Sequence, residues 1–252
     1  MAPPLIEVPP ALLERLRSAE RVVALTGAGV SAESGVPTFR DAQSGLWAQY
    51  RPEELATPEA FLKNPRMVWD WYAFRRTLTQ KAAPNPGHVA LSRFQELFGD
   101  FTLITQNVDG LHARAGSRDV IELHGNIETT LCFDEGTVAT EIADDGKSPP
   151  RCPQCGGLLR PGVVWFGESL PQAALERAEQ AAQRCEVLFS IGTSSLVHPA
   201  AGLAWVARRT GALLVEINPT STPLTVHVDY VLSGPAGQVL PLLVQQIEAV
   251  RG

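Results

Sequence analysis

Short apolar runs alternate with longer amphipathic stretches through most of this chain, and the alternation limits the folds that it can adopt. Runs of strand length occur at residues 22–25, 101–105, 120–123, 187–191, 213–217 and 228–232. Helical patterns lie at residues 11–19, 86–97, 172–183, 199–210 and 239–250. An alternation of strands and helices predicts a mostly parallel sheet with helices on both faces. We therefore expect an α/β fold with a doubly wound parallel sheet.

Composition excludes several other classes of protein. With 252 residues, 44% of them hydrophobic, the chain can bury the core of one large domain and a smaller satellite. A formal net charge of −6 argues against a nucleic-acid partner, because binding to a phosphate backbone needs clustered Lys and Arg. The first residues lack the pattern of a signal peptide, and no apolar run approaches ~18 residues. We expect a cytoplasmic protein without a membrane partner, and a monomer by default.

The first apolar run ends in a glycine-rich turn. Residues 27–32 read GAGVSA, which spells G-x-G-x-x-A, the pattern of a dinucleotide-binding turn in a Rossmann-like sheet. Backbone amides around Ala28 and Gly29 can cradle a pyrophosphate at a helix N-terminus, although a structural tight turn explains the same residues. A dehydrogenase would place an Asp or Glu about 20 residues further on, against the ribose. Residues 34–41, SGVPTFRD, form a loop broken by Gly and Pro instead.

Polar residues gather where the predicted strands end. The strand ends carry one glycine, Gly192, and the polar residues Gln106, Asn107, Asp109, His124, Thr193, Ser194 and Asn218. Loops are generally polar, so one such tip means little. The carboxyl ends of parallel strands meet at one edge of a sheet, however, so several polar tips together predict a single cleft.

Two stretches interrupt the alternation. Residues 42–80 contain an aromatic-rich helical pattern, and residues 125–161 contain three of the four cysteines among Gly, Asp and Pro. We expect both to be insertions that fold together as a small domain over the cleft, about 42–80 and 125–161. The core would then comprise about 1–41, 81–124 and 162–252.

Several motifs occur in one order along the chain: GAGVSAESGVPTFRD, TQNVDGLHARAG, ELHGN, CPQCGG, RPGVVWFGE, IGTSSLVHPAA and EINPT. Together they resemble the sirtuins, NAD-dependent protein lysine deacylases, of the bacterial kind, from about residue 20 to the C-terminus. The resemblance implies one sirtuin catalytic domain over residues 1–252, acting on acyl-lysine proteins or peptides. NAD would be consumed, giving nicotinamide, O-acyl-ADP-ribose and free lysine.

The resemblance also implies which residues bind NAD. The loop at 34–41 would hold NAD in a bent pose, Asp109 would receive the nicotinamide carboxamide, and Gln106 and Asn107 would orient the adjoining ribose. Without the resemblance, Asn107 and Asp109 are equally well explained as caps of a helix. The cofactor-binding residues that we expect are Gly27, Ala28, Gly29, Ser31, Phe39, Arg40, Gln106, Asn107, Asp109, Gly192, Thr193, Ser194, Asn218 and Ala236.

His124 is the candidate for catalysis, with Asn107 as its companion. Of the five histidines, it alone stands at a predicted strand tip followed by glycine. A lone histidine is more often structural. The family pattern implies that His124 is a general base, which takes a proton from a ribose hydroxyl after nicotinamide has left.

Substrate recognition is expected in two places. Residues 163–167, VVWFG, have the pattern of a buried strand that can pair with a peptide, and the resemblance makes Val164 and Phe166 acyl-lysine contacts. Tyr72 and Arg75 lie three apart, so on a helix they share a face. A solvated amphipathic helix is the ordinary explanation of this pair. The surrounding residues nevertheless resemble class III sirtuins, the desuccinylase and demalonylase class, in which this Tyr and Arg grip the acyl carboxylate.

The cysteines depart from the sirtuin pattern of two C-x2-C pairs. Cys152 and Cys155 form one pair, but Glu135 occupies the place of the second cysteine after Cys132. Between Glu135 and Cys152 lie 16 residues, a spacing typical of a zinc ribbon. Since zinc accepts carboxylate oxygen, we expect structural Zn²⁺ on three thiolates with Glu135 or Asp134 as fourth ligand, the alternative being a metal-free loop.

Other functions remain as alternatives at this point. A hydride-transferring oxidoreductase, a non-enzymatic NAD-binding module, and an NAD-consuming ADP-ribosyl transferase or hydrolase would each use a dinucleotide turn. We expect removal of succinyl and malonyl groups, with acetyl as a further substrate.

Overall fold

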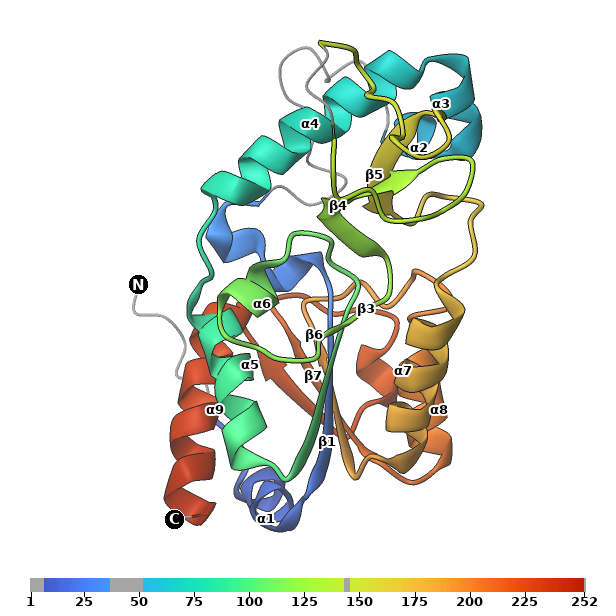
Figure 1. Cartoon of the computed structure of the whole chain (residues 1–252). Coiled ribbons are helices and arrows are strands. Elements are labelled where there is room, and N and C mark those ends of the chain that lie inside the picture. The colour runs from blue at the N-terminus through green and yellow to red at the C-terminus, as the bar shows by residue number, and fades with distance from the viewer. Residues whose placement is uncertain (1–6, 37–51, 143–145, 252) are drawn as a thin grey trace.

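A six-stranded parallel sheet forms the centre of the computed structural model, which describes residues 7–36, 52–142 and 146–251 (Figure 1). The strands run in the order β3-β2-β1-β6-β7-β8. Their bounds are Arg21–Thr26 (β1), Asp100–Thr105 (β2), Ile121–Glu122 (β3), Val187–Ile191 (β6), Leu213–Asn218 (β7) and Tyr230–Ser233 (β8). This order is that of a doubly wound dinucleotide-binding sheet, so the predicted fold class is confirmed.

Helices cover both faces of the sheet. On one face pack α1 (Pro10–Ser18), α5 (Pro86–Leu97) and α9 (Ala236–Arg251), and on the other α7 (Gln172–Arg184) and α8 (Gly202–Arg209). Every residue of β6 is buried, as expected for a strand that is covered from both sides. Figure 1 shows the two helical layers on either side of the strands.

The central strands end at the same level. Thr26, the last residue of β1, is paired with Thr105 of β2 on one side and with Ile191 of β6 on the other. The strand order reverses between β1 and β6, and ligands of such sheets bind in the crevice outside the carboxyl ends of the strands at this place. The fold therefore brings the predicted polar tips together.

A second group of elements lies beyond the carboxyl ends of the strands (Figure 1). It contains α2 (Pro52–Leu55), α3 (Pro58–Lys63), α4 (Pro65–Lys81) and the antiparallel strands β4 (Gly125–Cys132) and β5 (Leu159–Val163). These elements share a core of their own, which includes the buried aromatic side chains of Phe61, Trp71, Tyr72 and Trp165. They come from the two stretches expected to be insertions, and the division into two domains stays a prediction.

Two local predictions need correction. The expected strand at residues 163–167 is wrong, because β5 ends at Val163 and Gly167, with φ of 86°, lies in a turn. The helix expected after the glycine-rich turn is replaced by the 3-10 turns η1 (Ala28–Val30) and η2 (Ala32–Ser34). Gly35 ends the second of these in the left-handed conformation, which glycine adopts without strain.

Short helical segments complete the fold: α6 (Leu111–Arg114) after β2 and η4 (Thr225–His227) before β8. In the described parts of the chain, no helix combines the length and apolar character needed to cross a bilayer.

Candidate active site

The tips of β1 and β6 touch through glycine. A Cβ on Gly29 would lie 2.7 Å from the Gly192 Cα, and one on Gly27 would lie 2.8 Å from the Thr193 Cα. The Gly29 amide donates to the Gly192 carbonyl at 2.8 Å. This amide is therefore already hydrogen-bonded within the protein. The expectation that the Gly29 amide is free to bind a pyrophosphate is wrong. Ala28, beside it, is exposed at the turn.

A buried polar network joins the ends of β1 and β2. Asn107 Nδ2 donates to the Gly27 carbonyl and to Ser31 Oγ, both at 3.1 Å. Ser31 Oγ donates in turn to Asp109 Oδ2 at 2.7 Å. The other oxygen of Asp109 accepts the Leu111 amide at 2.9 Å, so Asp109 also satisfies the first amide of α6. The structure thus brings Ser31 together with Asn107 and Asp109, which lie 76 and 78 positions away in the sequence.

His88 belongs to this network, although its sequence context predicts only a role in capping. Its Nδ1 accepts the Asn85 amide at 3.3 Å, as part of a capping box, and its Nε2 lies 3.3 Å from Ser31 Oγ. Burial lowers the pKa of His88, and nearby Asp109 raises it. An Asn-Pro helix start explains the histidine completely, so no sequence signal reveals its second contact.

His124 lies between β3 and β4 with one ring nitrogen fixed. Its Nδ1 is 2.9 Å from the Gln106 carbonyl, which can only accept, so the proton of the neutral ring is on Nδ1. Nε2 then carries the lone pair. Burial lowers the pKa of His124, and the bond to Gln106 raises it. The net lowering keeps the ring neutral at pH 7, in the form that accepts a proton.

The remaining predicted cofactor residues surround the tips of β6 and β7. Gln106 Nε2 donates to Thr193 Oγ1 at 3.1 Å, and Asn218 Nδ2 donates to the Thr193 carbonyl at 3.0 Å. Ser194 is exposed beside them, and Ala236 is buried at the start of α9. Phe39 and Arg40 lie outside the described residues.

Tyr72 and Arg75 lie together on α4, with Tyr72 only 3% exposed. The Arg75 guanidinium carbon lies 5.0 Å from the centre of the Trp71 ring and 5.6 Å from that of Tyr72. Burial raises the pKa of Tyr72 to about 12, against the lowering effect of Arg75. Burial also lowers the pKa of Arg75, against the effects of Tyr72 and Asp109. A fully solvated helix face is therefore the wrong interpretation of this pair.

The segment after β5 runs from this aromatic core to His124. The Val164 amide donates to the His124 carbonyl at 2.9 Å, and the Phe166 amide donates to the Ala56 carbonyl at 2.9 Å. Val164 is half-buried, whereas the Phe166 side chain is 49% exposed. Of the two predicted acyl-lysine contacts, Val164 is thus linked directly to His124.

The thiols of Cys132, Cys152 and Cys155 converge. Their sulfur atoms all lie within 4.8 Å of one another, and each half of the cluster begins a turn. The Gly136 amide donates to the Cys132 carbonyl, and the Gly156 amide to the Cys152 carbonyl, both at 2.9 Å. Three converging thiols at the ends of such turns fit a structural zinc ion.

Glu135 and Asp134, the two residues expected as fourth ligand, both lie outside this group of converging ligand atoms among the described residues. Glu135 is exposed. Asp134 reaches over Gly157, where an added Cβ would lie 2.2 Å from Asp134 Oδ2 and 3.3 Å from Cys155 Sγ. Cys185 is buried elsewhere, at the end of α7, where burial raises its pKa to about 12.

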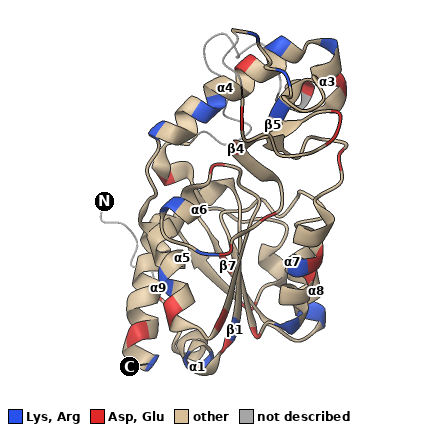
Figure 2. Cartoon of the chain, in the orientation of Figure 1, with Lys and Arg blue, Asp and Glu red and all other residues tan. Residues whose placement is uncertain are grey.

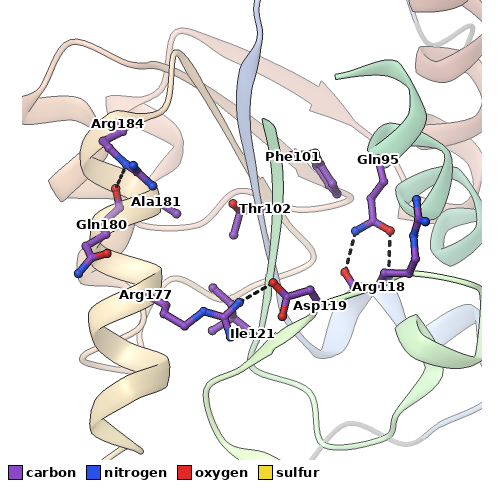
Figure 3. A pocket seen from close by; sticks show the side chains of 10 residues that line it. All are labelled: Gln95, Phe101, Thr102, Arg118, Asp119, Ile121, Arg177, Gln180, Ala181 and Arg184. Carbon is purple, nitrogen blue, oxygen red and sulfur yellow. Dashed lines mark hydrogen bonds and ion pairs between the residues drawn. The ribbon is translucent and has the colours of Figure 1, made fainter. Parts of the chain in front are cut away.

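A separate cavity of about 220 Å³ lies at the outer edge of β2 (Figure 3). It is lined by Phe101 and Thr102 of the strand and by three arginines, of which Arg177 is paired with Asp119 at 2.7 Å. These strand residues are at the amino-terminal half of β2. The cavity therefore lies away from the strand tips, and it contains none of the predicted site residues.

Comparison with known proteins agrees with this geometry. The Sir2 family model matches residues 27–199. An NAD-dependent protein deacylase of Aquifex aeolicus is 55% identical over 209 residues, which cover 82% of this chain and 87% of the relative.

Two solved structures are similar over nearly the whole chain. A complex of a Sir2 homologue with NAD has a TM-score of 0.91 and 47% identity, and the match covers 98% of this chain and 96% of that one. A complex of Sir2 with a p53 peptide and NAD⁺ has a TM-score of 0.84 and 31% identity, covering 95% and 98%. With these matches and its ordered motifs, the chain belongs to the Sir2 family, the sirtuins.

Proposed function

We propose that this protein removes acyl groups from protein lysines with consumption of NAD, and that it prefers succinyl and malonyl over acetyl groups. Similar proteins bear the name NAD-dependent protein deacylase, and solved relatives bind NAD and a peptide. The acyl preference rests on one observation about this chain. Tyr72 and Arg75 lie in an aromatic core whose segment after β5 is hydrogen-bonded to His124.

The strand-tip network supports the proposed binding of NAD. NAD, as a co-substrate, supplies the glycosidic bond that the reaction breaks. Asp109 and Asn107 would hold the nicotinamide side, and Thr193, Ser194 and Asn218 the adenosine side, where amide and hydroxyl groups replace the acidic ribose ligand of dehydrogenases. Ala236 would pack near the adenine, and Phe39 and Arg40 stay predicted contacts.

His124 serves as the general base in this proposal. After the acyl oxygen has displaced nicotinamide from the ribose, Nε2 of the neutral ring would accept the proton of a ribose hydroxyl. The hydroxyl oxygen would then add to the acyl carbon, and the lysine amine would leave. The bond from Nδ1 to the Gln106 carbonyl fixes the ring and favours the imidazolium that forms. Asn107 assists by orienting the same ribose.

The end of the acyl chain would meet Tyr72 and Arg75. A guanidinium can bind a carboxylate through two hydrogen bonds, and the phenol can donate a third. The surrounding Trp71 and Trp165 keep water away, which strengthens such charge-assisted bonds. Basic residues recur along α4, which carries Arg66, Arg75, Arg76 and Lys81 against Asp70 (Figure 2). Of these basic residues, Arg75 lies beside Tyr72, so its charge would attract an anionic acyl group although the chain as a whole is acidic.

Nicotinamide release with NAD and matched lysine peptides tests the proposed function. We expect kcat/KM for a succinyl-lysine peptide to exceed that for the acetyl-lysine peptide by about tenfold or more. This ratio corresponds to the free energy of one hydrogen bond to a charged group. Unmodified peptide should release no more nicotinamide than NAD alone. Equal release without an acyl group would instead indicate an NAD hydrolase, and formation of reduced nicotinamide an oxidoreductase. An acetyl preference would leave deacylation standing and overturn the proposed acyl preference.

We infer that Cys132, Cys152 and Cys155 hold a structural zinc ion with Asp134 as fourth ligand. Zinc would join the turn after β4 to the turn before β5. Asp134 is favoured over Glu135 because its carboxylate and Cys155 Sγ approach the same point above Gly157. The absence of a Cβ at Gly157 leaves room for this carboxylate.

Zinc content of purified variants tests this ligand set. We expect Asp134→Ala to lower the affinity for Zn²⁺ by about tenfold or more, the effect of losing a group that supports a metal site. Glu135→Ala, the matched control, should bind as the parent protein does. Cobalt substitution gives an independent readout, since its absorption spectrum reports the number of thiolate ligands. A loss of affinity confined to Glu135→Ala would reverse the assignment.

We also propose that residues 42–80 and 125–161 form a small domain inserted into the core of residues 1–41, 81–124 and 162–252. The cluster around Phe61 and Trp165, which is distinct from the clusters on the two faces of the sheet, supports this division.

A further inference from the structure

The indole of Trp165 touches the proposed acyl-recognition pair. Trp165 is 2% exposed, and its Nε1 donates to the Tyr72 hydroxyl oxygen at 3.1 Å. An indole nitrogen can only donate, so the phenol oxygen is the acceptor in this bond. The proton of the Tyr72 hydroxyl is then left to donate elsewhere. Trp165 thereby fixes the position of the phenol oxygen. The hydroxyl proton of Tyr72 then points away from the indole.

An ion pair holds the indole from the other side. The guanidinium carbon of Arg160, a residue of β5, lies 3.5 Å from the centre of the Trp165 ring. Arg160 donates to both carboxylate oxygens of Glu168, at 2.5 and 2.9 Å. Glu168 also accepts the Trp165 backbone amide at 2.7 Å. The same ion pair therefore fixes both the backbone and the ring of Trp165.

Burial makes this arrangement rigid. Arg160 is 8% exposed, and one of its nitrogens donates to the Val163 carbonyl at 2.9 Å. Phe61 packs against the Trp165 ring with a centroid distance of 5.3 Å. This pair is costly to break, because Arg160 alone would be a buried, uncompensated charge. These contacts thus hold the indole N–H pointing toward the Tyr72 hydroxyl.

We propose that Arg160, Glu168 and Trp165 form a clamp that positions the Tyr72 hydroxyl and so sets the preference for acyl groups that end in a carboxylate. The three are positioning residues, which act through Tyr72. The inference rests on the proposed function, since it deepens the role of the Tyr72 and Arg75 pair. It predicts that selectivity depends on a side chain that does not itself bind the acyl carboxylate.

Trp165→Phe removes the indole N–H and keeps an aromatic ring. We expect kcat/KM for the succinyl-lysine peptide to fall about tenfold, with a change of about twofold or less for the acetyl-lysine peptide. Because the clamp acts through Tyr72, the double variant Trp165→Phe/Tyr72→Phe should lose no more selectivity than Tyr72→Phe alone. The measurement is a double-mutant cycle in kcat/KM with both peptides.

Phe61→Leu is the matched control, since it loosens packing on the same ring and leaves the hydrogen bond to Tyr72. It should change kcat/KM for both peptides by similar factors. Glu168→Gln, which unpairs Arg160, should shift selectivity in the same direction as Trp165→Phe. It supplies the test if Trp165→Phe unfolds, with thermal denaturation reporting the fold of each variant.

Two outcomes overturn the clamp while the proposed function stands. One is an equal loss with both peptides in Trp165→Phe, and the other is additivity with Tyr72→Phe, in each case with a parent protein that prefers succinyl-lysine. A parent protein without that preference contradicts the proposed function instead, so the two failures are distinguishable.

Discussion

His124→Ala should lower formation of deacylated peptide by about 10²–10⁴-fold, the usual contribution of a general base. The structure leaves Nε2 as the only proton acceptor of the ring, because Nδ1 is bound to the Gln106 carbonyl. Alanine removes that acceptor and leaves the contacts of Asn107 and Asp109 in place. Chromatographic quantification of free-lysine peptide measures the effect.

Nicotinamide release provides a second readout for this variant. In the proposed reaction His124 acts after nicotinamide has left, so release should fall less than deacylation does. His227→Ala is the control, since His227 is exposed and its ring makes an edge-to-face contact with the Trp205 ring, with a centroid distance of 4.7 Å. Deacylation at the parent rate in His124→Ala would exclude this residue as the base, and an equal loss in His227→Ala would mean that the assay reports general damage.

Arg75→Met should lower kcat/KM for a succinyl-lysine peptide by about 10²-fold, within the range of losing a charge-assisted bond. Methionine keeps much of the side-chain volume but cannot bind a carboxylate. The acetyl-lysine peptide has no carboxylate to lose, so its kcat/KM should change by a few-fold at most. The preference should therefore reverse, which parallel kinetics with the two peptides would detect.

Arg76→Met controls for the loss of a neighbouring charge. Arg76 donates from Nε to the Ile127 carbonyl at 2.8 Å and lies over Trp69, so its role is structural. It should affect the two peptides alike. An unchanged ratio of succinyl to acetyl kcat/KM in Arg75→Met would contradict the proposed grip on the acyl carboxylate.

Most of the sheet was predictable because of its periodicity. A continuous apolar run such as residues 187–191 is typical of a strand covered on both faces, and β6 occupies the same residues. The antiparallel pairing of β4 with β5 was not predicted. Its partners are distant, with Gly125 opposite Val163, and β4 mixes polar and buried residues. Neither strand has a local sequence pattern that indicates which strand it pairs with.

The candidate site, too, could be predicted from the sequence only in part. The strand-tip rule predicts that Asn107 and Asp109 share one cleft without knowledge of any contact, whereas Ser31 was expected from the resemblance alone. The bond between Trp165 and Tyr72 joins residues 93 positions apart and depends on how two inserted stretches pack. The bond from the Gly29 amide to the Gly192 carbonyl was also not predictable, because a motif gives the position of an amide and not its hydrogen-bond partner.

The close fit of Gly27, Gly29 and Gly192 restricts how such a protein could be redesigned. Since even a methyl group at Gly27 or Gly29 would collide with backbone atoms, the floor of the proposed nucleotide site has no freedom to vary. An engineer seeking a different nucleotide would have to leave that floor intact and alter the rim, at exposed Ser194 or half-buried Asn218.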